Sequence, residues 1–521
     1  MKFLNNDWGW DVEKTPPFLA FRSLRRKAVE RYGEANIFDV SQGEPGYGFA
    51  PSERGRRFFS FLLLADTVLN NNRTESRFGS ETEETCPDIE KTLQEIIRTH
   101  YAPDFANILQ DDLEEFLSSL ETIFQKQGHP KTRFEILFDL FKFSVLSGGR
   151  YPNSWGEMIV RMTVAEEHSE TLGFPISFED IILLAGASQG VGMFFKGLGE
   201  EGIGFLQRGD AVLMISPVYA PYMQFAEDRG LHLLSVSIHP ETGAVDEESI
   251  QNALNASERI KAIILIDPNN PTGFPIETEV LERIADIAEK HNSLILTDEV
   301  YASFFPGKSS IVQIERAKKR TIRLDAISKI ERSTGVRLGS LYLAPEAREF
   351  IAREILEPEC PGFIEKYSDM RWFLFLAKSS GGRTIGVFQH ISGVPGSSQI
   401  LGLCHLILGK KERKEYVDHL RKKVLAFYSA AGLPEPKNMY YGIIDIAKIE
   451  GEESKKKPIE QVLTELAVEG GLIVMPAHKF FPKEEQKKHN TKRLIRVSLP
   501  NLSYENTKKA GAIFSKILRR E

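Results

Sequence analysis

The chain has 521 residues, and its 66 Lys and Arg against 73 Asp and Glu give a formal net charge of −7 at pH 7. Its 41% hydrophobic and 27% charged residues are typical of a folded globular protein and exclude a wholly disordered or collagen-like chain. The acidic balance argues against nucleic acid or an anionic membrane as a partner held by bulk charge, and no apolar run approaches the ~18 residues of a membrane span.

The amino terminus lacks the apolar segment of a secretory signal. The three cysteines, Cys86, Cys360 and Cys404, lie far apart and have neither metal-ligand spacing nor the even number of a disulfide framework. Such cysteine usage is typical of a reducing compartment. The sequence therefore predicts a cytoplasmic protein without a metal site.

Residues 51–148 show apolar side chains at helical spacing, with no strand pattern between them. In one stretch the predicted buried face consists of Ile108, Leu113, Leu117, Leu120 and Phe124. We expect a helical insertion that packs against the main body, and its simplest interpretation is a structural extension.

Short β-branched runs alternate with amphipathic stretches between residues 181 and 344. The predicted strands are Ile181–Leu184, Ala211–Ile215, Leu233–Ile238, Ala262–Ile266, Leu294–Thr297, Ile322–Ile327 and Ser340–Leu343. The predicted helices between them include Gln189–Gly199, Ala220–Arg229, Glu247–Leu254 and Glu277–His291. Apolar strands joined by helices indicate a mostly parallel sheet that is buried on both faces. After Glu346, helices and a mixed segment predict a smaller α+β domain.

Polar residues follow the carboxyl ends of these strands, which is where ligands bind in open α/β sheets. The stretch Ala185–Gly190 runs from small residues into a helix, whose free N–H groups suit an anion. Later strand ends carry Tyr219, the Asp267–Gly273 loop, Asp298 with Tyr301, Lys329 and, eight residues on, Arg337. A lysine beside a buried strand is costly unless it is neutralised. A Schiff base removes that cost.

Five motifs occur in chain order: Gly186-Ala187-Ser188-Gln189, Asn270-Pro271-Thr272-Gly273, Asp298-x-x-Tyr301, Ser328-Lys329 and Gly335-x-Arg337-Leu338-Gly339. Together they resemble the fold-type I, class I/II aminotransferases of the aspartate aminotransferase superfamily, which use pyridoxal 5′-phosphate (PLP). The resemblance implies an α/β fold, with a seven-stranded, mostly parallel sheet flanked by helices and a smaller α+β domain. The expected division is residues 1–50 joining the small domain, 51–148 as the insertion, 149–345 as the PLP-binding domain and 346–521 as the small domain.

The resemblance also assigns residues to the cofactor ring. Lys329 resembles the catalytic lysine that forms the Schiff base and moves the proton. Asp298 matches the acid that pairs with the pyridine nitrogen and keeps it protonated. Tyr301 and Asn270 match the two groups that bond the phenolic oxygen, and Tyr219 would stack on the ring.

The same resemblance assigns residues to the phosphate and the substrate. Arg337, Ala187 and Ser188 would hold the phosphate, and Tyr151 resembles the tyrosine lent to the phosphate of a partner subunit. Arg496 resembles the arginine that clamps the substrate α-carboxylate, with Gly43 and Asn270 beside it. Family proteins tend to carry cis bonds before the prolines matched by Pro217 and Pro271.

Two features resemble a long-chain branch, the aspartate β-decarboxylases: the surplus length before Tyr151 and the segments Arg150-Tyr151-Pro152 and His390-Ile391-Ser392-Gly393. That branch has an arginine where this chain has Gln42, so a carboxylate-rich substrate loses one positive partner. We therefore expect ping-pong transamination between an L-amino acid and a 2-oxo acid, with aspartate-like substrates, in a homodimer or higher homo-oligomer. The alternatives are an aspartate β-decarboxylase or other PLP lyase and, more remotely, an inactive PLP-binding scaffold.

Overall fold

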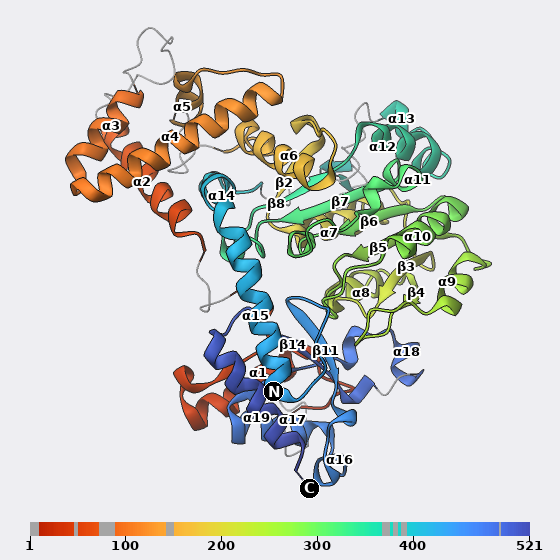
Figure 1. The fold of residues 1–521 in the computed structure, drawn as a ribbon. Coiled ribbons are helices and arrows are strands. Elements are labelled where there is room, and N and C mark those ends of the chain that lie inside the picture. The colour runs from red at the N-terminus through yellow and green to blue at the C-terminus, as the bar shows by residue number, and fades with distance from the viewer. Residues whose placement is uncertain are drawn as a thin grey trace.

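The computed structural model describes residues 10–45, 51–71, 89–141, 151–366, 376–378, 384–386, 393–488 and 491–520. Arg150 and residues 390–392, on which part of the β-decarboxylase resemblance depends, lie outside them, as does Cys86. Figure 1 shows a sheet with helices in the upper part of the molecule and a smaller α+β part below it. Helices α1 (Pro17–Tyr32) and α19 (Tyr504–Leu518), from the two ends of the described chain, lie in that lower part.

A seven-stranded sheet forms the centre of the upper part. Its strands run in the order β2-β8-β7-β6-β5-β3-β4, and β8 is antiparallel to both of its neighbours while the other pairs are parallel. The bounds are Ile181–Leu184 (β2), Ala211–Ser216 (β3), His232–Ser237 (β4), Ile260–Ile266 (β5), Leu294–Asp298 (β6), Thr321–Ala326 (β7) and Gly339–Tyr342 (β8). The predicted seven-stranded, mostly parallel sheet is therefore confirmed, with strand ends that differ by one or two residues.

Helices cover both faces of this sheet, as the apolar strands require. On β3, Val212 and Met214 belong to a core shared with α7 (Ala187–Leu198) and α8 (Ala220–Glu227). The alternate residues Leu213 and Ile215 belong to a second core on the opposite face. That second core is closed by α9 (Glu247–Leu254), α10 (Thr278–His291) and α11 (Glu315–Lys318).

The predicted insertion is helical wherever it is described. It contains α2 (Glu53–Asn71), α3 (Ile89–His100), α4 (Pro103–Lys126) and α5 (Arg133–Phe141), and it contacts α6 (Met158–Leu172) and α14 (Gly396–Leu408). Leu113, Leu117, Leu120 and Phe124 of α4 are buried as predicted, but Ile108 is 43% exposed. The prediction was wrong there because Leu109, four residues before Leu113, occupies the buried stripe instead.

The lower part is built from both ends of the chain. A small antiparallel sheet has the order β11-β14-β13, with β11 at Tyr441–Asp445, β13 at Met475–Pro476 and β14 at Leu494–Ser498. The short strand β1 (Phe38–Asp39) pairs in parallel with β12 (Leu472–Ile473). The surrounding helices are α1 (Pro17–Tyr32), α15 (Arg413–Ala431), α16 (Glu452–Lys455), α17 (Ile459–Gly470), α18 (Lys483–Lys488) and α19 (Tyr504–Leu518). The division into four domains stays a prediction.

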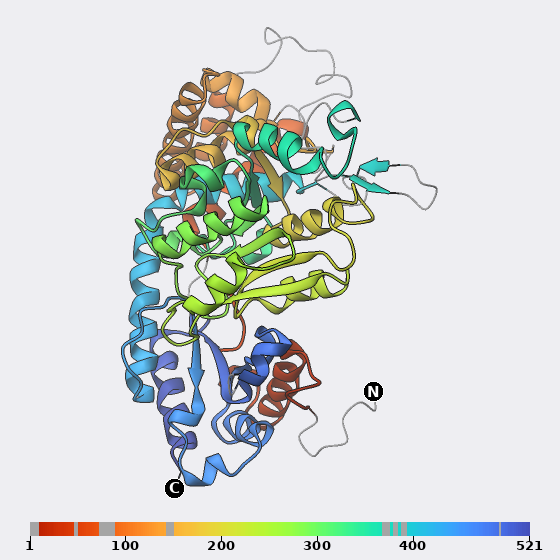
Figure 2. The ribbon, with the colours of Figure 1, turned by 90° about the vertical axis from the view of Figure 1, so that its right-hand side faces the viewer.

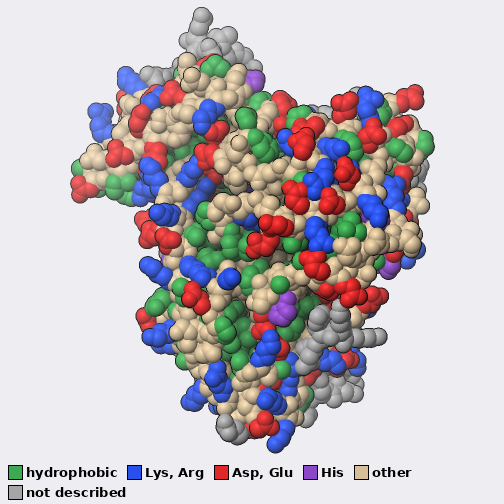
Figure 3. All heavy atoms as spheres, turned by 45° about the vertical axis from the view of Figure 1, so that its right-hand side comes forward, with side chains coloured by type: hydrophobic (Ala, Val, Ile, Leu, Met, Phe, Trp, Pro, Cys, Tyr) green, Lys and Arg blue, Asp and Glu red, His purple; other side chains and the backbone are tan. Residues whose placement is uncertain are grey.

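The remaining elements lie between β8 and α14 in the chain. α12 (Pro345–Phe350) continues into a π-helix at Ile351–Leu356 and is followed by α13 (Phe363–Lys366). The hairpin of β9 (Leu376–Lys378) and β10 (Thr384–Gly386) projects from the body in Figure 2. On the face drawn in Figure 3, acidic and basic side chains are interspersed. Within the described ranges, no helix is long and apolar enough to cross a membrane.

Candidate active site

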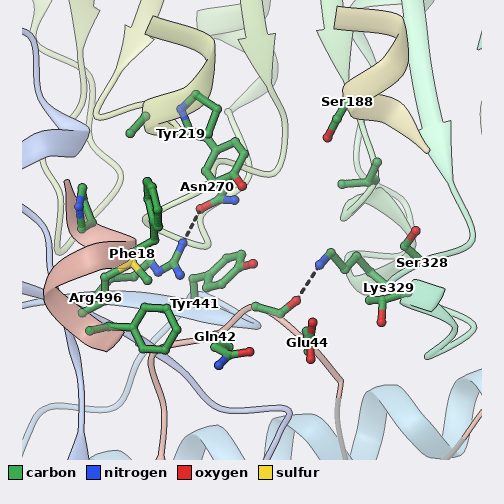
Figure 4. Close-up of a pocket in the computed structure, with 18 of the residues that line it drawn as sticks. Phe18, Gln42, Glu44, Ser188, Tyr219, Asn270, Ser328, Lys329, Tyr441 and Arg496 are labelled. Carbon is green, nitrogen blue, oxygen red and sulfur yellow. Dashed lines mark hydrogen bonds between the residues drawn. The ribbon is translucent and has the colours of Figure 1, made fainter. Parts of the chain in front are cut away.

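A cavity of about 1020 Å³ lies at the carboxyl ends of the central strands and against the lower part of the molecule. Ten of the eleven residues predicted for the site line it, from both parts of the chain (Figure 4). They are Gly43, Ala187, Ser188, Tyr219, Asn270, Asp298, Tyr301, Lys329, Arg337 and Arg496. The eleventh, Tyr151, is 97% exposed and does not line the cavity.

Lys329 follows the end of β7, and its side chain projects into the cavity (Figure 4). Its Nζ donates a hydrogen bond to the carbonyl oxygen of Gly43 at 2.5 Å. The removal of water around the amine and the nearby charge of Arg496 lower the pKa of Lys329 to about 8, against the opposing effects of Glu44 and Asp298. Roughly a tenth of this amine is therefore neutral, and nucleophilic, at pH 7, far more than for an ordinary lysine.

Asp298 is the last residue of β6 and is buried. The hydroxyl of Tyr222 donates to its Oδ2 at 2.5 Å, and the backbone N–H of Val300 donates to its Oδ1 at 3.2 Å. Burial raises the pKa of Asp298 to about 6, although these two donors oppose the rise. Asp298 is consequently a carboxylate above pH 6. The sequence analysis missed Tyr222, whose signal was its position one helical turn after Tyr219.

Three tyrosines lie near Gly43: Tyr301 and Tyr441 line the cavity, whereas Tyr440 is buried outside its lining. The hydroxyls of Tyr301 and Tyr441 are 3.0 Å apart, and the hydroxyl of Tyr440 donates to the Gly43 carbonyl at 2.9 Å. Tyr440 has φ +69°, a left-handed conformation that a bulky residue rarely adopts. A Cβ at Gly43 would lie 1.8 Å from Oη of Tyr441, so this position has no room for a side chain. Sequence analysis found neither Tyr440 nor Tyr441, because no motif surrounds them.

Arg496 lies in the middle of β14 and is only 3% exposed. Its Nη1 donates to Oδ1 of Asn270 at 3.2 Å and its Nη2 to the Ser41 carbonyl at 2.7 Å. The guanidinium carbon lies 4.6 Å from the ring centre of Tyr441 and 5.2 Å from that of Phe480. Among the described residues its buried Nε has no hydrogen-bond partner. A planar guanidinium held in this way, with a free donor, suits a carboxylate.

The amino terminus of α7 and the Arg337 side chain form a cradle at the opposite end of the cavity. Arg337 has φ +58°, and its guanidinium donates to the carbonyls of Thr334 and Ala185, each at 3.0 Å. A Cβ at Gly186 would lie 2.2 Å from Arg337 Nη2, so the absence of a side chain lets the arginine approach the helix end. Free N–H groups, Ser188 and a guanidinium are a donor set for a phosphate. With Lys329 and Asp298 in the same cavity, the residues present fit PLP.

The backbone around the site carries two cis peptide bonds, Ser216–Pro217 and Asp267–Pro268. The expectation for Pro217 is confirmed. The expectation for Pro271 was wrong, since the cis bond in that loop precedes Pro268 instead.

Sequence comparisons find similarity to aminotransferases. Residues 150–356 match the family model "Aminotransferase class I and II". The aspartate aminotransferase of Pyrococcus horikoshii is 30% identical over 181 residues, which cover 34% of this chain and 44% of that protein. A bifunctional aspartate aminotransferase and L-aspartate β-decarboxylase from a Pseudomonas species is 24% identical over 351 residues, which cover 62% of this chain and 65% of that protein. The match thus spans less than half the length of the Pyrococcus enzyme.

The fold is shared over nearly the whole chain. The crystal structure of aspartate aminotransferase from Thermotoga maritima superimposes with a TM-score of 0.60 at 17% identity, covering 97% of this chain and 98% of that one. Residues 150–356 are thus similar to the class I and II aminotransferases, and the whole chain shares the fold of the Thermotoga aspartate aminotransferase.

Proposed function

We propose that this protein is a PLP-dependent aminotransferase that moves an amino group from an L-amino acid to a 2-oxo acid. The observation that carries the proposal is Lys329, an amine with a pKa lowered to about 8 that shares one cavity with Asp298, Arg337 and Arg496. The match of residues 150–356 to the aminotransferase family model and the names of the relatives support it.

Bound PLP supplies an aldehyde that exchanges amino groups and a ring that accepts an electron pair. Asp298, ionised above pH 6, would hold a proton on the ring nitrogen. Asn270 and Tyr301 would bond the phenolic oxygen, and Tyr219 would cover the ring. The cradle of Ala187, Ser188 and Arg337, described above, would hold the phosphate.

The remaining residues would act on the substrate. Arg496, fixed by Asn270 and Ser41, would clamp the α-carboxylate and so orient the α-carbon toward Lys329. The neutral Lys329 amine would take the proton from the α-carbon, as a general base with a pKa near the working pH. Gly43, whose lack of a side chain makes room for the Tyr441 hydroxyl, would lie with its backbone beside that carboxylate.

We further propose a dicarboxylic, aspartate-like substrate and a homodimer. The relatives named as aspartate aminotransferases support the substrate. The 97% exposure of Tyr151 supports the dimer, because a tyrosine that serves a partner's phosphate must leave its own chain. The cytoplasmic location stays a prediction from the sequence.

The test combines chemical trapping with turnover. The PLP-loaded protein is reduced with borohydride and digested, and mass spectrometry is expected to find the pyridoxyl label on Lys329. Turnover of L-aspartate with 2-oxoglutarate is expected to fall by at least ~10²-fold in Lys329→Ala, because the proton-transfer group is lost. Lys290→Ala, a change at an exposed helical lysine, is the control and should keep both label and turnover. A label elsewhere would contradict the proposal.

A second candidate is aspartate β-decarboxylation, which the coverage of the bifunctional Pseudomonas relative favours. The two reactions are separated by product analysis. Transamination of L-aspartate yields more than one equivalent of oxaloacetate per bound PLP only when a 2-oxo acid is present, whereas β-decarboxylation continues to yield alanine and carbon dioxide without an added acceptor.

A further inference from the structure

The cavity does not end at Arg496 but continues along helix α1. Five α1 residues that line it, namely Phe18, Phe21, Arg22, Arg25 and Arg26, follow one another at intervals of three, one, three and one. This spacing places them on one face of the helix. Val29 also lines the cavity, so the face extends from Phe18 over eleven helical steps, or ~16 Å at 1.5 Å per residue. In Figure 4, Phe18 lies beside Arg496, on the side away from Lys329.

The three arginines of this face differ in how their charges are compensated. Arg25 forms ion pairs with Glu34 and Asp39. Arg26 lies 3.9 Å from Glu30, a pair with both side chains about 70% exposed, which contributes little. Arg22 is exposed to the cavity and has no ion pair with any of the described residues. Its charge is therefore available to a ligand.

The acidic residues of the cavity lie away from Arg22. Glu44 and Asp298 act on Lys329, at the reaction end. Glu30 lies two helical turns beyond Arg22, at ~12 Å along the axis. Between these ends the described lining offers an aromatic surface, Phe18 and Phe21, followed by a cationic one.

We propose that this face of α1 is the subsite for the substrate side chain and that Arg22 binds a carboxylate at the far end of it. This narrows the dicarboxylic class proposed above: the preferred substrate is then a 2-aminodicarboxylic acid, or its 2-oxo acid, with a side chain longer than that of aspartate, and aspartate is a poorer substrate of the same site. Methylene groups of the chain would pack on Phe18 while Arg496 holds the α-carboxylate. The inference depends on the proposed function for the role of Arg496. The contact between Arg22 and a ligand carboxylate can nevertheless be tested by binding alone, without amino transfer.

The first test measures binding without turnover. Isothermal titration of the PLP-loaded protein compares the α,ω-dicarboxylates succinate, glutarate and adipate with the monocarboxylates butyrate, valerate and hexanoate. We expect glutarate or adipate to bind at least ~10-fold more tightly than the monocarboxylate of equal length, as for one charge-assisted contact. Arg22→Gln should abolish that preference. Arg31→Gln, an exposed arginine on α1 outside the cavity lining, should retain it.

Two results would overturn the inference: equal binding of the two acid series by the parent protein, or an undiminished preference in Arg22→Gln. If succinate binds more tightly than glutarate and adipate, the assignment of a side chain longer than that of aspartate is also overturned. Because the titration needs no reaction, failure of the proposed function would show separately, as absence of amino transfer from any amino acid.

The second test measures turnover. L-2-Aminoadipate and L-norleucine have side chains of similar length, of which only the first ends in a carboxylate. Arg22→Gln should lower kcat/KM for L-2-aminoadipate by ~10-fold more than for L-norleucine. Equal losses for both substrates would indicate a structural role of Arg22 and contradict the proposal.

Discussion

Lys329 must lose a proton before its amine can attack an aldehyde, and its surroundings favour that loss. Its pKa is lowered to about 8, first by loss of water and next by the charge of Arg496. Below the pKa the ammonium form dominates and is unreactive. Above it the neutral amine dominates, and a further rise in pH adds no reactive form.

The rate at which the apoprotein takes up PLP should therefore rise ~10-fold per pH unit below pH 8 and become constant above it. Stopped-flow absorbance between pH 6 and 10 measures this rate. Arg496→Gln removes a positive charge that lowers the pKa, so its profile should become constant at a higher pH. A parent rate that still climbs steeply at pH 10 would show an ordinary lysine and contradict the prediction.

The site residues that could be predicted from the sequence belong to short motifs at strand ends, where the neighbouring residues in the chain determine their position. Lys329 and Asp298 are of this kind. Tyr222, Tyr440 and Tyr441 were not predicted. Tyr441 reaches Tyr301 across 140 residues of chain, and Tyr440 reaches Gly43 across 397. Such contacts depend on how the small sheet packs on the large one, and no local pattern carries that information.

Among the elements, the strands of the large sheet were predictable because each is a short apolar run buried on both faces. The helical insertion was predictable in type but not in the details of its packing. Exposed Ile108 shows why. With a helical period of 3.6, a single apolar residue can be assigned almost equally well to the buried stripe or to the neighbouring exposed one. The ion pairs between α2 and α4 also could not be predicted from hydrophobic periodicity, because they join residues far apart in the sequence.

Asp112 of α4 holds two arginines of α2. Its Oδ1 accepts from Arg54 at 2.7 Å and its Oδ2 from Arg57 at 2.6 Å, and the carboxylate side chain is 2% exposed. Asp112→Asn should lower the free energy of unfolding by about 3 kcal/mol, because it removes the buried counter-charge of Arg57 and leaves Arg54 with Glu115 alone. Urea unfolding followed by circular dichroism measures the loss.

Asp111→Asn changes the neighbouring but exposed carboxylate of the same helix and serves as the control. It should alter stability by less than about 0.5 kcal/mol. Equal effects of the two substitutions would show that charge on α4, rather than the pairing with α2, determines the stability of the insertion.

At the scale of the whole molecule, the exposed Tyr151 predicts a dimer whose two subunits share residues at each phosphate site. If it completes the phosphate site of a partner subunit, then Tyr151→Ala and Lys329→Ala damage different sites of one dimer. A mixed dimer of the two variants contains one site with both residues intact. Mixing the two weakly active variants, with exchange of subunits, should restore a substantial part of the parent turnover.

The control is each variant mixed with itself under the same conditions, which should gain nothing. Sedimentation of the mixture checks that dimers have formed. A monomeric protein, or a mixture no more active than its components, would contradict the assignment of Tyr151.

Apart from Asn270, which is assigned to both, the residues proposed for the cofactor and those proposed for the substrate carboxylates come from different parts of the chain. Lys329, Asp298 and Arg337 follow strands of the large sheet, whereas Arg496 lies in β14 of the small sheet and Arg22 on α1. Evolution could then exchange the substrate while the reaction stays the same, by changes confined to about residues 10–45 and 439–500. A laboratory chimera that carries those two segments from a relative of different specificity would inherit the relative's choice of amino acid and keep this chain's chemistry.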